Sequence, residues 1–334
     1  MRRFVFAITL LAGAFAVAAP ARPAAPPAPA EPKFVNDDEL YEQFFEKVQA
    51  LAKQKKTLAH KQLVAKMNPR AAGVVPAKPG SKALAPEEVY AAAVNSVWIV
   101  GSAYLDKEGE WQRGTYATAW VAAADGVLVT NWHVFEDLQD GEVFAASDRD
   151  GNIYPVTDFI GGDKTADVAV FRVGAKGLTP LPIAPAYAEI GSWVGVVSHP
   201  ADLFYMFTQG AVTRYSTNKN EDDRVEKWMG ITAEYASGSS GAPVLNKYGT
   251  VVGMAALTLS LDAHDDAAKG QNPARRAKPV ANPKRLSRAD QPKDDKGDKP
   301  KPPEKPEEKP KGSSQQMVVK LAVPGPTVLK WVGK

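Results

Sequence analysis

The feature that most limits the fold is a series of short apolar runs, separated by turn residues, over residues 96–259. Ten runs follow one another: SVWIVGSAY, TYATAWVAA, GVLVTNWHV, EVFAASD, NIYPVTDFI, ADVAVFRV, GSWVGVVSH, FTQGAVTRYS, GITAEYA and GTVVGMAALTL. Their length and spacing are typical of strands in an antiparallel barrel or sandwich. No long helical pattern separates them, which argues against a parallel sheet with crossover helices. The sequence therefore predicts an all-β domain.

The chain contains no cysteine, so this domain must be stabilised by its apolar core alone. Disulfide bonds, thiol catalysis and cysteine-based metal sites are excluded. The four histidines, at positions 60, 133, 199 and 264, form no His-x-x-x-His pair, and no carboxylate cluster has the spacing of a metal-binding loop. We therefore expect no metal and no other cofactor.

Residues 1–18 have the pattern of a secretory signal peptide. Arg2 and Arg3 precede the apolar run FVFAITLLAGAFAV, and the small residues 16–18 form a cleavage site. The run is short for a membrane span, so an uncleaved anchor is the less favoured alternative. We expect an exported bacterial protein, periplasmic or extracellular, with no stable membrane insertion after cleavage. Without the two arginines, 39 basic side chains balance 38 acidic ones, a net charge of +1, so nucleic acid is not an expected partner.

The N-terminal part contains one predicted helix between two linkers. Residues 19–33 are a Pro/Ala-rich linker, and residues 34–83 are a helical extension followed by a second linker. Asn36 and Glu39 have the spacing of a capping box. An apolar face follows from Leu40, Tyr41, Phe44, Phe45, Val48 and Leu51. This face either packs on the chain's own domain or joins subunits in a homo-oligomer.

The C-terminal part divides into two segments of different composition. Residues 263–315 are rich in Lys, Pro, Asp and Glu and have almost nothing to bury, so we expect disorder and predict that residues 265–314 can be removed. Residues 316–334 are apolar again. Within them MVVKLAV, Met317 to Val323, is predicted to add a strand to the barrel.

The segment EYASGSSGAPVLN, residues 234–246, holds three serines among small residues. A serine hydroxyl becomes a good nucleophile only beside a base, usually a histidine, that is itself oriented by a third group. His133 ends a strand pattern in GVLVTNWHV, and Asp167 precedes a buried-looking run, where a charge needs a partner. The order His133, Asp167, Ser240 is that of the chymotrypsin-like enzymes. An α/β-hydrolase fits less well, because Ala242 replaces the second glycine of its Gly-x-Ser-x-Gly elbow.

Together these segments resemble the chymotrypsin-like serine proteases, most closely the bacterial HtrA/Deg-type branch. LVTNWHV is similar to the family's Thr-Asn-x-His-Val segment, ADVAVFRV to Asp-Leu-Ala-Val, GSSGAPVLNKYGTVVGM to Gly-Asn-Ser-Gly-Gly-Pro-Leu with the next strand, and VGVVSHP to a Gly-x-Pro turn. The resemblance covers residues 86–261. It implies a double six-stranded β-barrel for the domain at residues 84–262, without a following PDZ domain.

The resemblance also implies residue roles. Ser240 is the nucleophile, His133 the base and Asp167 its orienter, in a serine endopeptidase that hydrolyses unfolded or extended polypeptides through an acyl-enzyme. The loop of Gly238, Ser239 and Ser240 forms the oxyanion hole; the N–H groups of Gly238 and Ser240 converge, and Ser239 points away. The sequence departs from the family at Trp132, which can crowd the base, and at Ser239 and Ala242. Trp132, the long polar tail and the apolar C-terminal segment keep open a second interpretation, a non-catalytic scaffold of the cell envelope.

Specificity rests on a count from the nucleophile. In chymotrypsin-like enzymes the residue six positions before the nucleophile forms the floor of the primary pocket, here Glu234. One wall comes from Met254, Ala255 and Ala256 in the following strand. A carboxylate at an apolar floor favours Lys or Arg in the substrate. The HtrA-type relatives instead prefer small or medium apolar side chains, and Glu234 can also point to solvent.

Overall fold

The computed structural model describes residues 34–333 except 59, 137, 221 and 263–314. The predicted signal peptide at 1–18, the linker at 19–33 and the tail at 263–315, apart from Gln315, lie outside the described residues. The described residues from Asn36 onward form one structural unit. No helix in the described part of the chain is long and apolar enough to cross a membrane.

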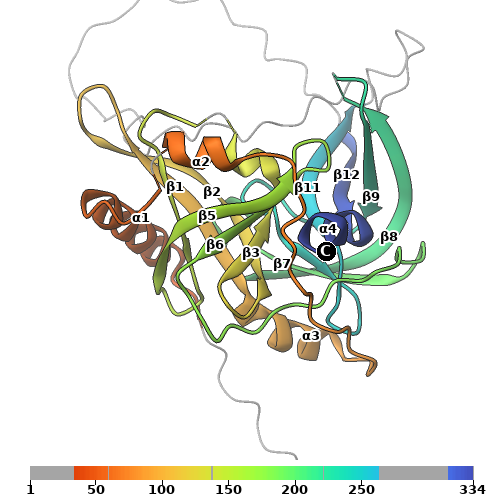
Figure 1. Cartoon of the computed structure of the whole chain (residues 1–334). Coiled ribbons are helices and arrows are strands. Elements are labelled where there is room, and N and C mark those ends of the chain that lie inside the picture. Colours follow the sequence, from red (N-terminus) through yellow and green to blue (C-terminus); the bar gives the residue numbers. More distant parts are fainter. Residues whose placement is uncertain (1–33, 59, 137, 221, 263–314, 334) are drawn as a thin grey trace, which may run out of the picture. The chain divides into compact units, whose positions relative to one another are not determined.

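Two closed antiparallel barrels of six strands each form the molecule (Figure 1). The first has the order β1-β2-β3-β6-β5-β4 and the second the order β10-β11-β12-β9-β8-β7. The strands of the first barrel are β1 Val97–Leu105, β2 Trp111–Ala123, β3 Val127–Thr130, β4 Val143–Ser147, β5 Ile153–Asp163 and β6 Val168–Val173. Those of the second are β7 Trp193–Ser198, β8 Met206–Lys219, β9 Val225–Ile231, β10 Pro243–Leu245, β11 Val251–Asp262 and β12 Gln315–Pro324. The predicted fold class is confirmed.

Alternation along the strands explains how both faces of the sheet are buried. In β1, Trp98 and Val100 belong to one apolar cluster, with Leu128 and Phe171 of the same barrel. Val97 and Ile99, which point the other way, belong to a second cluster that extends into the helices and the other barrel. Successive side chains of a strand face opposite sides, so this one strand contributes to both cores.

Two strands differ from the sequence prediction. The run GITAEYA was predicted as a strand, but β9 begins earlier, at Val225, and ends at Ile231. Glu226 and Lys227 made this segment look polar, although Trp228 and Met229 behind them are buried. The remainder of the predicted run forms the loop that leads to Ser240. β10 has only three residues, too few for a recognisable pattern.

The predicted strand at 317–323 is present, but it does not lie at an edge. β12 pairs with β11 on one side and with β9 on the other, so it closes the second barrel. The helix α4, Gly325–Val332, follows it and buries Val328 and Val332. The pair of barrels therefore extends beyond the expected bounds of 84–262.

The helix α1, Asp37–Lys53, packs its apolar face on the first barrel. Tyr41, Phe44, Phe45 and Val48 are buried, and a Cβ at Gly101 of β1 would lie 2.7 Å from the Phe44 ring. Asn36 accepts the N–H of Glu39 as predicted, whereas the carboxylate of Glu39 binds the Asn36 side-chain amide rather than its backbone N–H. The first of the two interpretations of this helix is therefore the one observed. Its apolar face is used within the chain.

Five shorter helical segments complete the fold. They are α2 His60–Lys66, α3 Pro86–Ala93, and the 3₁₀ turns η1 Val94–Ser96, η2 Trp132–Phe135 and η3 Pro200–Asp202. Of these, η2 carries the predicted base and η3 follows the turn VGVVSHP.

The β11–β12 register predicts that an internal deletion of residues 263–314 leaves the protein folded, whereas a truncation after Asp262 does not. Asp262 and Gln315 are direct partners across the two strands. A two-residue Asn-Gly turn can therefore join them in place of residues 263–314. We expect this variant to melt cooperatively with a near-native midpoint. Truncation after Asp262 instead removes Leu321, Val323, Val328 and Val332, which are buried. Each is worth about 1.5–3 kcal/mol, so we expect the truncated chain not to fold. Circular dichroism melting of both variants checks this, and an unfolded Asn-Gly variant would contradict the observed register.

Candidate active site

The turn η2 holds His133 at the end of β3. Trp132, Val134 and Phe135 are buried around it, and the His133 side chain remains 37% exposed. The indole of Trp132 packs edge-on against Phe159 at 5.2 Å, and its Nε1 donates to Glu136 at 3.1 Å. Trp132 therefore anchors the turn from inside the barrel and does not crowd the imidazole.

Asp167 lies in the tight turn between β5 and β6. Its φ of 53° is in the left-handed region, which Asp and Asn adopt more readily than most other residues with a side chain. Its backbone is fixed on both sides, because Asn131 Nδ2 donates to the Asp167 carbonyl at 3.0 Å and the Asp167 N–H donates to Lys164 at 3.1 Å. The carboxylate also accepts the backbone N–H of His133 at 3.1 Å. The turn thus presents a nearly buried carboxylate to the histidine.

Ser240 follows a turn that only glycine allows. The N–H of Ser239 donates to the carbonyl of Ala236 at 3.0 Å, and Gly238, at the third position of this turn, has a φ of 91°. These are the features of a type II turn. A Cβ at Gly238 would lie 2.3 Å from the His199 carbonyl oxygen, and one at Gly241 would lie 2.2 Å from that of Thr118. Neither position accepts a side chain.

The two barrels bring three side chains together. His133 Nδ1 lies 3.0 Å from both carboxylate oxygens of Asp167, and His133 Nε2 lies 2.9 Å from Ser240 Oγ. His133 and Asp167 come from the first barrel and Ser240 from the loop before β10 of the second. Nucleophilic catalysis by a serine requires a hydrogen-bonded chain of this kind.

The carboxylate changes the titration of the base. Burial of the imidazole alone lowers the pKa of His133, but the charge and hydrogen bond of Asp167, with a smaller contribution from Glu136, outweigh it. The pKa of His133 is therefore raised above its ordinary value of 6.5. The pair stabilises the imidazolium form that the base adopts when it takes a proton.

Two backbone N–H groups around Ser240 have no protein acceptor in the described part of the chain. Thr118 binds both neighbouring carbonyls: its N–H donates to Ser240 O and its Oγ1 to Gly238 O, each at 2.9 Å. Within the described part of the chain, the N–H groups of Gly238 and Ser240 donate to no protein acceptor. Ser239 was included in the predicted oxyanion hole, but its N–H is used in the turn and its hydroxyl donates to Ser198 at 3.1 Å. Ser239 is therefore a buried support.

The predicted specificity residues do not form a pocket with a carboxylate at its floor. The Glu234 side chain is 71% exposed and lies 3.3 Å from Lys320 Nζ, so it already has a cationic partner. Met254 and Ala255 are fully buried, and Ala255 pairs through its backbone with Gly241 and Ala242. Among the residues of the predicted wall, only Ala256 is partly exposed. The alternative in which Glu234 points to solvent is the one observed.

Sequence reasoning missed two supporting residues and left one histidine unassigned. The two supporting residues are Asn131 and Thr118. Asn131 belongs to the quoted LVTNWHV segment, so the sequence pattern could have indicated it. No sequence pattern around Thr118 indicates its role. His199 is fully buried, its Nδ1 accepts the N–H of Tyr205 at 3.1 Å, and burial lowers its pKa to about 3. His199 is thus a neutral structural residue that supports the turn beneath Gly238.

Comparison with known proteins defines the class. Residues 117–254 match the family described as trypsin-like peptidase domain. A periplasmic serine endoprotease of the DegP-like type from Chlamydia pneumoniae is 30% identical over 138 residues, 41% of this chain and 28% of the relative. The serine endoprotease DegS of Haemophilus influenzae is 25% identical over 166 residues, 49% of this chain and 48% of the relative. A solved serine endoprotease from Yersinia pestis has a TM-score of 0.42 and 21% identity, covering 53% of this chain and 59% of that one.

The chain therefore contains a trypsin-like peptidase domain. More closely, that domain is homologous to the Deg-type serine endoproteases, as the quoted segments implied. The chain spans less than half the length of the two curated relatives named above.

The Asp167–His133 pair predicts the direction of a pH dependence. We expect NMR titration to place the pKa of His133 above 6.5 and the Asp167→Asn variant to place it below, because burial then acts without the carboxylate. Glu136→Gln, the matched control, should lower the pKa less. The folded pKa is raised, so the stability that the protonated pair contributes is complete below pH 6.5 and is lost as pH rises through the folded pKa. An unchanged pKa in Asp167→Asn would contradict the assignment.

Proposed function

We propose that this chain is an exported serine endopeptidase that cleaves unfolded or extended polypeptides in the cell envelope, in protein processing or quality control. The observation that carries the proposal is the continuous hydrogen-bonded chain from Asp167 through His133 to Ser240, at 3.0 and 2.9 Å. Homology to endoproteases that are periplasmic by description supports the location.

The mechanism follows from the positions of these atoms. His133 Nε2 takes the hydroxyl proton of Ser240 as Oγ attacks the carbonyl carbon of a peptide bond. Asp167 keeps the proton on Nδ1 and stabilises the imidazolium that forms. The oxyanion receives the N–H groups of Gly238 and Ser240, each worth about 3 kcal/mol in such sites. His133 then protonates the leaving amine, and water hydrolyses the acyl-enzyme by the same steps.

The competing function is a scaffold that has kept the barrel fold and lost turnover. Its main support in the sequence was a bulky Trp132 beside the base. The indole points into the barrel, against Phe159, and the Nε2 to Oγ distance is that of a hydrogen bond. These contacts favour the enzyme.

Cleavage of an unfolded protein tests the proposal. We expect Ser240→Ala to lower the rate of casein cleavage by at least about 10⁴-fold, because nothing else in the triad can form the acyl-enzyme. Its thermal midpoint should stay within a few degrees of the parent. Ser81→Ala, which changes an exposed serine of the linker, serves as the control with full activity. Equal cleavage by parent and Ser240→Ala would refute the proposal.

We also propose that the primary pocket admits only small apolar side chains. The resemblance puts this pocket between the segment before Ser240 and β11. The ring of Tyr235 is buried there, and its hydroxyl donates its one hydrogen to Leu321 O at 2.6 Å, with Leu257 O also close at 3.1 Å. Tyr235 therefore bridges the two walls, and Lys320 neutralises Glu234 from the far side.

Cleavage of a peptide library distinguishes a small apolar pocket bounded by Tyr235 from a pocket whose specificity is set by Glu234. We expect cleavage after Ala or Val, unchanged in Glu234→Gln because that carboxylate is exposed and paired. Tyr235→Leu should shift the preference toward larger side chains, since it removes the bridge between the walls. A preference for Lys or Arg that is lost in Glu234→Gln would show that Glu234 sets the pocket instead.

A further inference from the structure

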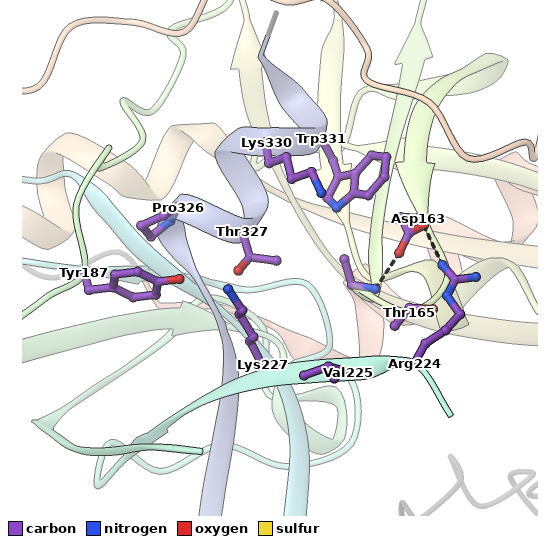
Figure 2. A pocket seen from close by; sticks show the side chains of 11 residues that line it. Asp163, Thr165, Tyr187, Arg224, Val225, Lys227, Pro326, Thr327, Lys330 and Trp331 are labelled. Carbon is purple, nitrogen blue, oxygen red and sulfur yellow. Dashed lines mark hydrogen bonds and ion pairs between the residues drawn. The ribbon is translucent and has the colours of Figure 1, made fainter. Parts of the chain in front are cut away.

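A cavity lies where α4 meets the two barrels, beside the turn that leads to Asp167. It has a volume of about 490 Å³, within the range of small-molecule sites. Figure 2 shows its walls: α4 with Pro326, Thr327, Lys330 and Trp331, the start of β9, the loop residue Tyr187, and the turn that leads to Asp167. The resemblance and the mechanism assign no role to this cavity.

Most of the charged side chains that line the cavity are cationic. Arg224, Lys227 and Lys330 line it, against a single carboxylate, Asp163. That carboxylate is already satisfied, because Arg224 lies 3.1 Å from one of its oxygens and the N–H of Ala166 donates to the other at 2.8 Å. Among the described residues, neither lysine has an ion-pair partner. Two ammonium groups are thus left for a ligand.

The ammonium groups of Lys227 and Lys330 come from different walls of the cavity. Figure 2 shows the Lys227 side chain rising from β9 toward Thr327 of α4. Lys330 is held by the face of Trp331, with Nζ 4.9 Å from the ring centre. A cation held over an aromatic ring loses little freedom when it binds an anion.

Uncharged groups in the walls add to the site. Thr165 Oγ1 is buried and has no hydrogen-bond partner within the described chain, which is unusual for a protein hydroxyl. Tyr187 and Pro326 offer apolar surface, and the Tyr187 ring is held edge-on by Tyr215 at 5.4 Å. The surface that the cavity offers to a ligand therefore combines cationic groups and flat apolar walls.

We propose that this cavity binds a small organic anion, in which a phosphate or carboxylate group meets Lys227 and Lys330 and a flat apolar body packs on Tyr187 and Pro326. The ligand would contact both barrels and the turn of Asp163 to Asp167, so it stabilises the folded state by mass action. The proposal is independent of peptidase activity.

Calorimetric titration of the mature chain carrying Ser240→Ala tests the proposal without self-digestion. The probes are phenyl phosphate, benzoate and inorganic phosphate at low salt. We expect saturable 1:1 binding of phenyl phosphate or benzoate, tighter than that of inorganic phosphate and weakened by added NaCl. Whichever aromatic anion binds identifies the head group. If inorganic phosphate bound as tightly as the aromatic anions, the apolar walls would contribute nothing to binding. That result would overturn the proposal.

Matched variants locate the binding. Lys227→Met and Lys330→Met should each weaken binding about tenfold, the loss typical of one charge-assisted hydrogen bond. Lys227→Arg should retain it, and Lys107→Met, an exposed lysine on the hairpin between β1 and β2, should not change it. Thermal melting confirms that each variant is folded. Absence of saturable binding, or binding that all the cavity variants leave intact, would overturn the proposal.

Discussion

Thr118 of β2 connects the loop of Ser240 to the barrel that carries His133. Its N–H and Oγ1 bind the carbonyls of Ser240 and Gly238, and its own carbonyl accepts Thr130 Oγ1 at 2.8 Å, at the end of the strand that leads to His133. Both hydrogen bonds to the loop cross from one barrel to the other. Ser240 and His133 therefore take their relative position from contacts of one residue, made by its backbone N–H and its hydroxyl. A change of packing between the barrels would move Oγ away from Nε2.

The same contacts explain why the loop has its composition. Gly241 approaches Thr118 O and Thr130 so closely that a Cβ would lie 2.2 Å from either oxygen, and Gly238 lies equally close to His199. Ala242 occupies a position where the family has glycine, yet it is fully buried and its N–H donates to Ser239 at 2.9 Å. The loop thus tolerates a methyl group at position 242 and at neither glycine. The departure at Ala242 has no consequence for the geometry of Ser240.

How much could be predicted from sequence depended on the range of the interactions. The alternation of apolar residues located most strands, and three short segments identified His133, Asp167 and Ser240, because those signals are local. β12 was recognised as a strand but not as the one that closes the barrel, since its partners are set by register with β9 and β11. The sequence left the position of Glu234 open between pocket floor and solvent for a similar reason: its partner Lys320 is remote in sequence and adjacent only after the barrel closes. Thr118 could not be identified at all, because its role rests on contacts with the other barrel.

The central claim is that the triad is assembled and Ser240 is nucleophilic in the folded protein as it stands. Labelling with a fluorophosphonate, followed by mass spectrometry of the peptides, measures this directly, because the reagent loses fluoride and phosphonylates only a serine that has both a working base and an oxyanion site. The account predicts one labelled residue, Ser240, with labelling abolished in His133→Ala and strongly slowed in Thr118→Val, which removes the hydroxyl that binds the Gly238 carbonyl. A folded protein that takes up no label, or takes it up on another serine, would contradict it.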